Sequence, residues 1–373
     1  MDEAAPVLPD YGGACLSSVV PALSAGDDAV PSWLPEPVRG ARQVVLLALD
    51  GLGWRQLRQE SAQAPTLCSG SGGPATSVVP TTTATALTSL TTGRVPAEHG
   101  VVGYRIVLGA DGTGPEVMNV LRWETPAGDA RRRYPASELQ PWPAFGRAGV
   151  PAVTRAEFAQ TGFTAAHLRG ARLVGWRVPS TLVVEVRRLL AEGAPLVYVY
   201  YDGLDKVAHE FGLGDHYRAE MKTADRLVAD LLETLPSGSA LLVTSDHGQV
   251  EVGMSVRLPG PELMEAVSLM SGEGRFRWLH ARPGAADDLL KAAEEAHGDE
   301  AWVRTRQQVV DDGWFGGALP PALGARLGDV ALVARSPVAF LDPADTGETR
   351  LLARHGSLTE AEMLVPLLGW AAT

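Results

Sequence analysis

Six side chains that could bind metal ions are spread along the chain. They are three carboxylates and three imidazoles: Asp50, Asp205, His209, Asp246, His247 and His355. Asp205 and His209 are four residues apart, so both lie on one side of a helical turn and can reach one ion. Asp246 and His247 are adjacent, and His355 lies near the end of the sequence. Nitrogen and oxygen ligands in this mixture suit zinc, with manganese and iron as competing metals.

A run of threonines supplies a candidate nucleophile. Thr81, Thr82 and Thr83 precede a pattern that predicts a helix over Ala84–Leu90. A threonine hydroxyl is a weak nucleophile at neutral pH, but a bound metal ion can deprotonate it. The free N–H groups at the start of this helix would point at an incoming phosphate, and Thr83 stands at that start. Thr82 is the alternative nucleophile, and a threonine in this place is often only a helix cap.

Three apolar runs predict the strands that carry most of these residues. Residues 43–49, 196–201 and 240–244 are each followed within a few positions by an aspartate and a glycine. Continuous apolar runs are typical of strands buried on both faces of a parallel sheet. Because sites gather at the carboxyl ends of such strands, the three ends predict one shared site. The pattern over Tyr217–Leu235 has one apolar face and stops at Pro236, which predicts a helix.

The fold class that follows is α/β, with a central, mostly parallel sheet flanked by helices. Residues 1–40 are rich in Pro, Ala, Ser and Gly and predict an extended lead-in before the catalytic domain, residues 41–373. Two stretches interrupt the alternation of strands and helices. We expect residues from about 104 to 190 to form a cap insertion that shapes substrate access, and further inserted elements at about 250–345.

Composition excludes several classes of protein. The chain has 373 residues, and 32 Lys and Arg against 44 Asp and Glu give a net charge of −12. General nucleic-acid binding needs a basic surface and is not expected. The longest apolar run, Val44–Leu49, is too short to span a bilayer. Met1–Glu3 does not resemble the start of a secretory signal. Together these features predict a cytoplasmic protein without a membrane partner. Cys15 and Cys68 form neither a disulfide framework nor a zinc motif.

Several motifs occur in a fixed order along the chain. They are Ala48–Leu52, Pro80–Thr83, Leu90–Gly93, Pro96–Gly100, Asp205–Gly212, Ser245–Gly248, His355–Gly356 and the tail Leu358–Pro366. Together they resemble the alkaline phosphatase superfamily, in particular its nucleotide pyrophosphatase/phosphodiesterase branch, over roughly residues 42 to 370. The sulfatase branch is not indicated, because Cys68 is followed by Ser69-Gly70 and not by the Cys-x-Pro-x-Arg context that sulfatases need.

The resemblance implies two zinc ions and a threonine nucleophile. The implied ligands are Asp205, His209 and His355 for one ion, and Asp50, Asp246, His247 and Thr83 for the other. Asp202 competes with Asp205, and the four-residue spacing to His209 favours Asp205. In the family the nucleophile lies nine residues before the threonine of a Thr-Gly pair, so Thr92 again selects Thr83. Thr83 would attack phosphorus and form a phospho-enzyme intermediate, which water then hydrolyses.

Two departures from the family pattern bear on the substrate. Ala84–Ala86 stands where many relatives have Phe-Pro-Asn, and Tyr104 stands where many have an asparagine that contacts phosphate. Tyr104 is therefore a candidate substrate-binding residue. The leading prediction is a phosphodiesterase or nucleotide pyrophosphatase acting on a small phosphorylated substrate. The alternatives are a phosphomonoesterase or phosphonate hydrolase with the same site, and a non-catalytic scaffold that binds a partner. The remaining histidines are expected in a structural turn (His99) or on the surface: His167, His216, His280 and His297.

Overall fold

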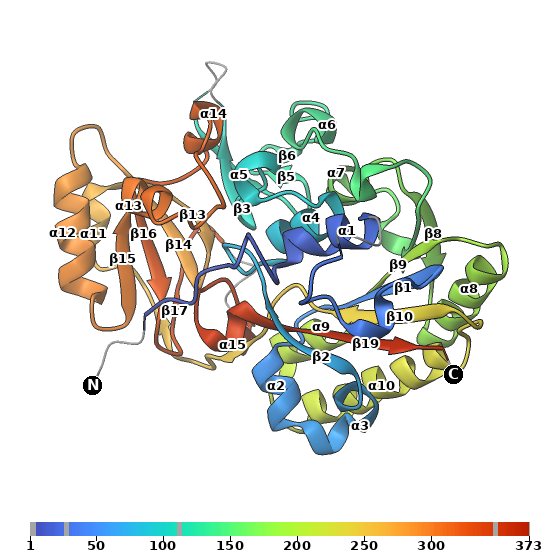
Figure 1. The fold of residues 1–373 in the computed structure, drawn as a ribbon. Coiled ribbons are helices and arrows are strands. Elements are labelled where there is room, and N and C mark those ends of the chain that lie inside the picture. Colours follow the sequence, from blue (N-terminus) through green and yellow to red (C-terminus); the bar gives the residue numbers. More distant parts are fainter. Residues whose placement is uncertain (1–4, 26–29, 110–113, 346–349, 373) are drawn as a thin grey trace.

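A seven-stranded sheet forms the centre of the computed structural model, which describes residues 5–25, 30–109, 114–345 and 350–372 (Figure 1). The strand order is β2-β19-β10-β1-β9-β7-β8. These strands are β1 (Gln43–Leu49), β2 (Ser71–Thr76), β7 (Pro151–Arg155), β8 (Arg172–Trp176), β9 (Leu196–Tyr201), β10 (Ser239–Thr244) and β19 (Leu364–Ala371). Only β19 of this sheet runs antiparallel to its neighbours. The predicted α/β class with a mostly parallel sheet is confirmed.

Helices cover both faces of this sheet. The longer ones are α1 (Leu16–Ser24), α2 (Trp54–Gln59), α4 (Thr83–Thr92), α7 (Gly162–His167), α8 (Pro179–Ala191), α9 (Gly203–Phe211) and α10 (Asp215–Leu232). The short ones near the sheet are η2 (Glu36–Val38), η3 (Ser61–Gln63), α3 (Pro65–Cys68), α5 (Pro96–His99), α6 (Ala136–Leu139), η4 (Ala144–Gly146), η5 (Ala156–Phe158) and α15 (Glu360–Met363). In Figure 1, α1, α4 and α7 lie on one side of the sheet, and α2, α9 and α10 lie on the other.

The side chains of β1 show why two layers form. Alternate residues of a strand point to opposite faces. Val44, Leu46 and Ala48 belong to one buried cluster, together with side chains of α1, α4 and α7. The residues between them and Leu49 belong to a second cluster, which includes side chains of α8, α9 and α10. A run that is apolar at every position therefore buries both faces of one central strand.

Smaller sheets lie beside the central one. One antiparallel sheet consists of β3 (Arg105–Leu108), β4 (Glu116–Asn119), β5 (Glu124–Thr125) and β6 (Gly128–Asp129). Another contains β13 (Val267–Glu273), β14 (Phe276–Ala281), β16 (Val330–Ala334) and β15 (Ala301–Thr305), with α11 (Pro261–Ala266), α12 (Ala286–His297), α13 (Arg306–Asp311) and α14 (Pro321–Gly324) nearby. Two strand pairs join β11 (Val250–Glu251) to β18 (Ala353–Arg354) and β12 (Val256–Arg257) to β17 (Ala339–Phe340).

The structure differs from two expectations about the order of elements. Residues 104–190 are not all an insertion, because β7 and β8 are strands of the central sheet and only the β3–β6 sheet stands apart from it. Residues 1–40 are not extended throughout, because α1 packs on α4; residues 1–4 and 26–29 of this stretch lie outside the described part of the chain. The two helices approach closely at Gly93, which ends α4 with a φ of 66°. A Cβ at this position would lie 2.8 Å from Pro21 of α1.

Two of the histidines expected on the surface are buried instead. The side chains of His167 and His297 are almost inaccessible to solvent. His167, at the end of α7, stacks on Phe163, and His297, at the end of α12, packs against Phe340. His280 is half-buried, and His216 is exposed. His99 is fully buried and accepts a hydrogen bond from the peptide N–H of Val101 at Nδ1, as expected of a structural turn. Structural histidines and metal-binding histidines can both be buried, so burial alone does not tell the two apart. The sequence pattern could not tell them apart either.

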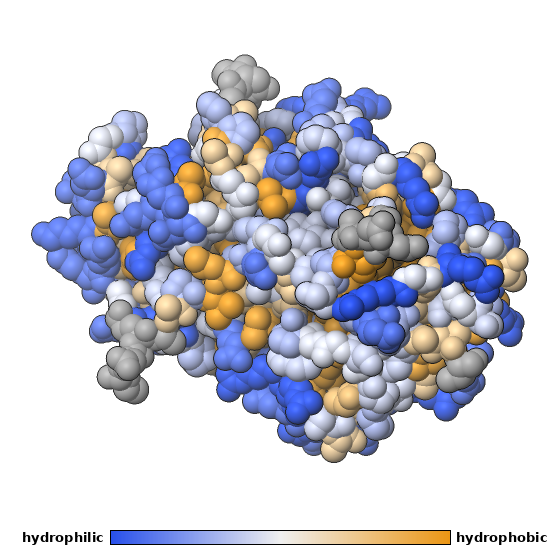
Figure 2. Space-filling view, viewed as in Figure 1, coloured by the Kyte–Doolittle hydropathy of each residue, from blue (hydrophilic) through white to orange (hydrophobic). Residues whose placement is uncertain are grey.

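The surface alternates between hydrophilic and hydrophobic residues. On the face drawn in Figure 2, the hydrophobic residues lie in several separate groups among hydrophilic and intermediate residues. No helix within the described ranges is long and apolar enough to cross a membrane. Cys15 and Cys68 are both free thiols.

Candidate metal centre

Three strand ends and one loop bring the six candidate ligands together. β1 leads to Asp50, β10 leads to Asp246 and His247, α9 carries Asp205 and His209, and His355 follows β18. The peptide N–H of Asp205 donates to the carbonyl oxygen of Asp50 at 3.1 Å, which ties the start of α9 to the end of β1. The loop that carries His355 is held beside the start of α4, where Thr81 forms an isolated bridge with Gly356. The predicted meeting of strand ends therefore occurs.

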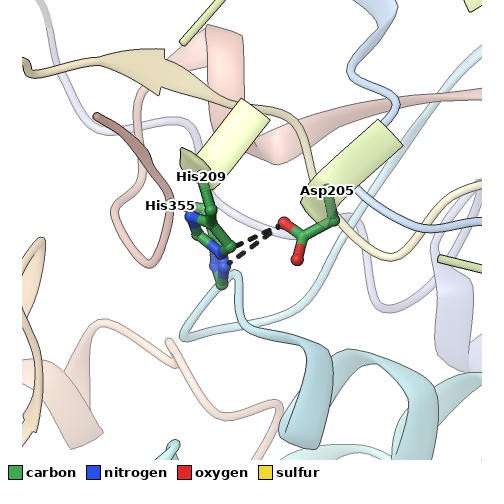
Figure 3. Close-up of side chains that lie close together, drawn as sticks. All are labelled: Asp205, His209 and His355. Carbon is green, nitrogen blue, oxygen red and sulfur yellow. Dashed lines mark ion pairs between the residues drawn. The ribbon is translucent and has the colours of Figure 1, made fainter. Parts of the chain in front are cut away.

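Asp205, His209 and His355 form the first ligand group. One donor atom from each side chain lies within 4.8 Å of the others. Figure 3 shows the two imidazoles side by side, with both facing the Asp205 carboxylate. Asp205 Oδ1 lies 3.3 Å from His209 Nε2 and 3.9 Å from His355 Nε2. Ligands at about 2.0–2.1 Å in a tetrahedral site are separated by about 3.3 Å, so this spacing suits an ion between them.

Asp50, Asp246 and His247 form the second ligand group, which is buried. His247 Nε2 lies 3.5 Å from Asp50 Oδ1 and 3.4 Å from Asp246 Oδ2. Neither of these two carboxylate oxygens has a hydrogen-bond partner in the described part of the chain. The other oxygen of each carboxylate is hydrogen-bonded, to Tyr200 in one case and to the peptide N–H groups of Gly51 and His247 in the other. Each carboxylate therefore directs one unpaired oxygen towards the centre of the group.

All three histidines are oriented through the nitrogen that faces away from the ligand groups. The Nδ1 atoms contact backbone carbonyls: His209 to Ala353 at 2.8 Å, His355 to Thr81 at 2.9 Å and His247 to Gly248 at 3.1 Å. An Nδ1–H that donates to a carbonyl leaves the lone pair of Nε2 free to bind a metal ion. The three Nε2 atoms are the ones that face the carboxylates. This arrangement fits metal ligation better than a set of paired surface charges.

The pKa values report how much negative charge is crowded into the centre. The pKa of Asp50 is raised well above its ordinary value, first by burial and then by the carboxylates of Asp246 and Asp205. The pKa of His355 is lowered well below its ordinary value, by burial and by the neighbouring imidazoles of His247 and His209. A neutral imidazole can donate its lone pair to a metal ion, and a divalent cation would offset the repulsion between the carboxylates. The residues present therefore fit a pair of divalent ions.

Thr83 lies at the start of α4, next to the second group. Its Oγ1 is 3.1 Å from His247 Nε2, and its side chain is largely buried. The helix begins at Thr83, one residue earlier than predicted, and Thr82 occupies the cap position without a side-chain cap hydrogen bond. The first N–H groups of a helix have no partner within it and favour an anion. Thr82 contributes to the wall of a neighbouring cleft, but within the described residues its side chain makes no hydrogen bond to either ligand group.

Asp202, the competitor of Asp205, belongs to neither ligand group. Its carboxylate accepts two hydrogen bonds from Arg155 Nε, at 2.6 and 2.8 Å, and lies 2.5 Å from Lys206 Nζ. Two cations therefore satisfy this carboxylate, which directly precedes α9 and lines the second cleft. The spacing argument that favoured Asp205 agrees with the geometry.

Two clefts open on either side of Thr83, and both include Asp205 and Leu121 in their walls. The first, of about 250 Å³, adjoins the first ligand group and is also lined by Tyr104, Arg122 and Arg354. The second, of about 220 Å³, adjoins Asp50 and is lined mainly by aromatic, threonine and apolar side chains: Leu87, Thr154, Phe158, Thr161, Phe163, Thr164, His167 and Tyr200. Tyr104 therefore lies where a substrate could reach it. Its hydroxyl accepts a hydrogen bond from Asn119 Nδ2 at 2.7 Å.

Several residues that support the ligands were not identified from the sequence. Gln249 Nε2 donates to Asp205 Oδ1 at 2.6 Å, and the Tyr200 hydroxyl donates to Asp50 Oδ2. The buried ion pair between Arg275 and Glu362 anchors the loop after His355, since Glu362 also accepts a hydrogen bond from the peptide N–H of Ser357 at 3.0 Å. Gln249 follows the Ser245–Gly248 motif directly, and this position beside the motif is the signal in the sequence that points to it.

Known structures with a similar fold cover most of this chain. An inactive variant of murine ectonucleotide pyrophosphatase/phosphodiesterase 5 in complex with AMP matches with a TM-score of 0.65 and 16% identity, over 89% of this chain and 88% of that one. The human protein of the same name matches with a TM-score of 0.65 and 16% identity, over 88% of each chain. Phosphonoacetate hydrolase from Sinorhizobium meliloti 1021 matches with a TM-score of 0.60 and 18% identity, over 89% of this chain and 90% of that one. No curated protein sequence matches this chain.

The family model for type I phosphodiesterases and nucleotide pyrophosphatases matches residues 44–358, a range that includes all six candidate ligands and Thr83. The chain is therefore a hydrolase of the phosphoryl-transfer type that acts on phosphodiester or pyrophosphate bonds. Its two groups of candidate ligands agree with the metal dependence of the family. On this match, the chain belongs to the type I phosphodiesterase/nucleotide pyrophosphatase family.

Proposed function

We propose that this chain hydrolyses its substrate with Thr83 as the nucleophile and with two zinc ions held by the two ligand groups. The observation that supports this most directly is the position of Thr83 Oγ1, 3.1 Å from His247 Nε2 at the start of α4. The ligand set of Asp205, His209 and His355 would hold one ion, and Thr83 would complete the set of the other. Zinc is the metal that this mixture of imidazole and carboxylate suits best.

In this proposal, each of the chain's own groups has a defined part. Two divalent ions supply the charge that stabilises the attacking and leaving oxygens of an in-line displacement. The Thr83 hydroxyl gives its proton to solvent, and its oxygen attacks phosphorus to form a phospho-threonine. The bond from phosphorus to the leaving group breaks on the opposite side, and the leaving group takes up a proton from solvent. The N–H groups at the start of α4 hold the phosphoryl oxygens. Water then attacks the phosphorus of the phospho-threonine and restores the hydroxyl.

We infer further that the substrate is a nucleotide or a related small phosphodiester, and that the β3–β6 sheet acts as the cap. The aromatic side chains Phe158 and Phe163 in the second cleft would accommodate a planar group next to Thr83. One relative of similar fold is an inactive threonine-to-alanine variant in complex with AMP, which supports both the substrate class and the nucleophile. Tyr104, at the edge of the β3–β6 sheet, would contact the substrate. A phosphonate is the second candidate, because a phosphonoacetate hydrolase shares the fold.

The test compares Thr83→Ala with the unchanged protein after reconstitution with zinc. We expect Thr83→Ala to retain both metal ions, because the three charged or imidazole ligands of each group remain. Turnover of bis-p-nitrophenyl phosphate should fall by at least about a thousandfold, because the nucleophile is removed. Thr82→Ala is the matched variant and should keep most of the activity. Metal content is measured by elemental analysis. Unchanged turnover in Thr83→Ala would refute the assignment, and faster cleavage of p-nitrophenyl phosphate or of phosphonoacetate would assign the site to those substrates.

A further inference from the structure

The two clefts beside Thr83 differ in a way that assigns one of them to the leaving group. Thr83 Oγ1 contacts His247 and so belongs with the second ligand group. An in-line displacement sends the leaving group away from the nucleophile, towards the other metal site. That site consists of Asp205, His209 and His355, all of which line the first cleft. If the proposed function holds, the first cleft receives the leaving group, and the second, aromatic cleft receives the part that stays on phosphorus.

Arg122 is a cation in the wall of the first cleft, and its guanidinium has no ion pair or hydrogen bond within the described ranges. Its backbone is well held, since its N–H donates to Asn119 Oδ1 at 3.0 Å. The next residue, Trp123, is fully buried and donates from its indole nitrogen to the carbonyl of Tyr134 at 2.8 Å. Asn119 also donates to the Tyr104 hydroxyl, so one amide holds the Tyr104 side chain and the Arg122 backbone. The turn between β4 and β5 therefore fixes the point from which the cation reaches into the cleft.

We propose that Arg122 determines leaving-group specificity by binding a negative charge carried on the leaving group. The second cleft offers no comparable cation, because Lys206, the basic side chain in its wall, is paired with Asp202 at 2.5 Å. The first cleft also contains the carboxylate of Glu273, which lies 3.8 Å from His355 Nδ1, the ring nitrogen that faces away from the ligand group. Arg122 is exposed, so its charge would select for an anion that extends from the metal centre towards solvent.

The guanidinium limits the chemistry of the group that it would bind. Its planar set of N–H donors matches the oxygens of a phosphate or a carboxylate, which accept two parallel hydrogen bonds. A leaving group with a second phosphate, such as inorganic pyrophosphate, and one with a carboxylate both meet this requirement. The shared feature is an anionic oxygen pair within a few bonds of the scissile phosphorus. A leaving group without such a charge would lose this contact and be cleaved less efficiently.

The experiment measures binding of two anions to zinc-loaded Thr83→Ala protein, which does not turn over. Inorganic pyrophosphate and phosphonoacetate are titrated by calorimetry at low ionic strength, with and without the additional change Arg122→Ala. We expect Arg122→Ala to weaken at least one of them by about tenfold, because one charge-assisted contact is lost. Arg132→Ala is the matched control, since Arg132 is an exposed arginine of the neighbouring β6 loop that lines neither cleft. Which anion is weakened distinguishes a phosphate from a carboxylate on the leaving group.

A kinetic comparison separates failure of this inference from failure of the proposed function. The ratio of kcat/KM for a nucleoside triphosphate to that for bis-p-nitrophenyl phosphate should fall about tenfold in Arg122→Ala and stay constant in Arg132→Ala. Arg122→Lys should recover part of the loss, because the charge remains while the planar donor pair is lost. Equal binding of both anions with and without Arg122 would overturn the inference, even if Thr83→Ala abolishes turnover. Full turnover by Thr83→Ala would instead overturn the proposed function.

Discussion

Replacing Tyr200 by phenylalanine tests whether the second ligand group depends on its supporting hydrogen bonds. The change removes one hydroxyl and leaves the ring, which is largely buried. That hydroxyl donates to Asp50 Oδ2, while Asp50 Oδ1 faces His247. Burial first, and then the carboxylates of Asp50 and Asp246, raise the pKa of Tyr200 well above its ordinary value, so the hydroxyl stays a donor at every working pH. Tyr200→Phe therefore removes a hydrogen bond to a metal-directed carboxylate and changes little else.

The expected magnitude follows from the charge of the acceptor. A hydrogen bond to an ionised group contributes roughly 1.5–3 kcal/mol, and loss of such a partner lowers metal affinity about ten- to a hundredfold. The direction of the change in metal affinity follows from the crowding of carboxylates around Asp50. Without metal, burial and the neighbouring carboxylates raise the pKa of Asp50, so the ionised form of this carboxyl is disfavoured. With metal bound, Asp50 is fully ionised and gains more from the donor. The hydroxyl thus stabilises the loaded state more than the metal-free state.

Tyr198→Phe is the matched control for this prediction. Tyr198 lies two residues earlier on β9, on the same face, and is fully buried, but its hydroxyl has no hydrogen-bond partner in the described part of the chain. We expect zinc affinity to fall in Tyr200→Phe and to stay unchanged in Tyr198→Phe, as measured by competition with a chromophoric chelator at pH 7. Thermal unfolding of both metal-free variants reports any general loss of stability. Equal affinities in the two variants would refute the reasoning.

Two further predictions concern stability. Burial first, and then the charge of Arg326, lower the pKa of His99 to about 3. Because the unfolded histidine takes up a proton below about pH 6.5, the protein loses stability as the pH falls, by about 3 kcal/mol at pH 4 from this residue. His99→Gln should remove that part of the pH dependence in urea unfolding with chelator present, and parallel curves for the two proteins would contradict it. Gly248→Ala should cost roughly 3 kcal/mol in denaturant unfolding, because its Cβ would lie 1.9 Å from the carbonyl oxygen of Ala361. Gly214→Ala, with nothing within 4 Å of the added atom, should cost little, and a similar loss in both would argue against the clash.

The central sheet and the ligand groups were open to prediction because they depend on local patterns. The apolar run Gln43–Leu49 has to be buried on both faces, and that requirement alone places it in the middle of a parallel sheet. Asp50 then stands at the carboxyl end of the strand, where sites form. The spacing of Asp205 and His209 likewise requires only a helical turn, which α9 provides. Short-range rules were therefore enough to identify residues that meet across the fold.

Residues that act through long-range contacts could not be predicted in the same way. In the sequence, Tyr200 looks like one more apolar residue of the run that forms β9. Its hydroxyl reaches Asp50 only because β9 pairs with β1 in this register. Arg122 and Asn119 lie in a stretch without clear periodicity, and their position beside the first cleft depends on how β4 packs against β3. The range given to the cap was too wide for a related reason. β7 and β8 are short and partly polar, and only the pairing of β7 with β9 and of β8 with β7 shows that they extend the central sheet.

The net charge of the chain also proved a poor guide to its site. A chain with a net charge of −12 would be expected to repel phosphates, yet its family acts on them. Two of its carboxylates, Asp50 and Asp246, are buried, and Asp205 is partly buried; all three are directed at two proposed ions. Three carboxylates against two divalent cations leave a net positive charge. Arg122 adds a further positive charge on the wall of the first cleft. Because fields decay within about a Debye length in salt, this local arrangement, and not the sum over the surface, decides which ligands approach.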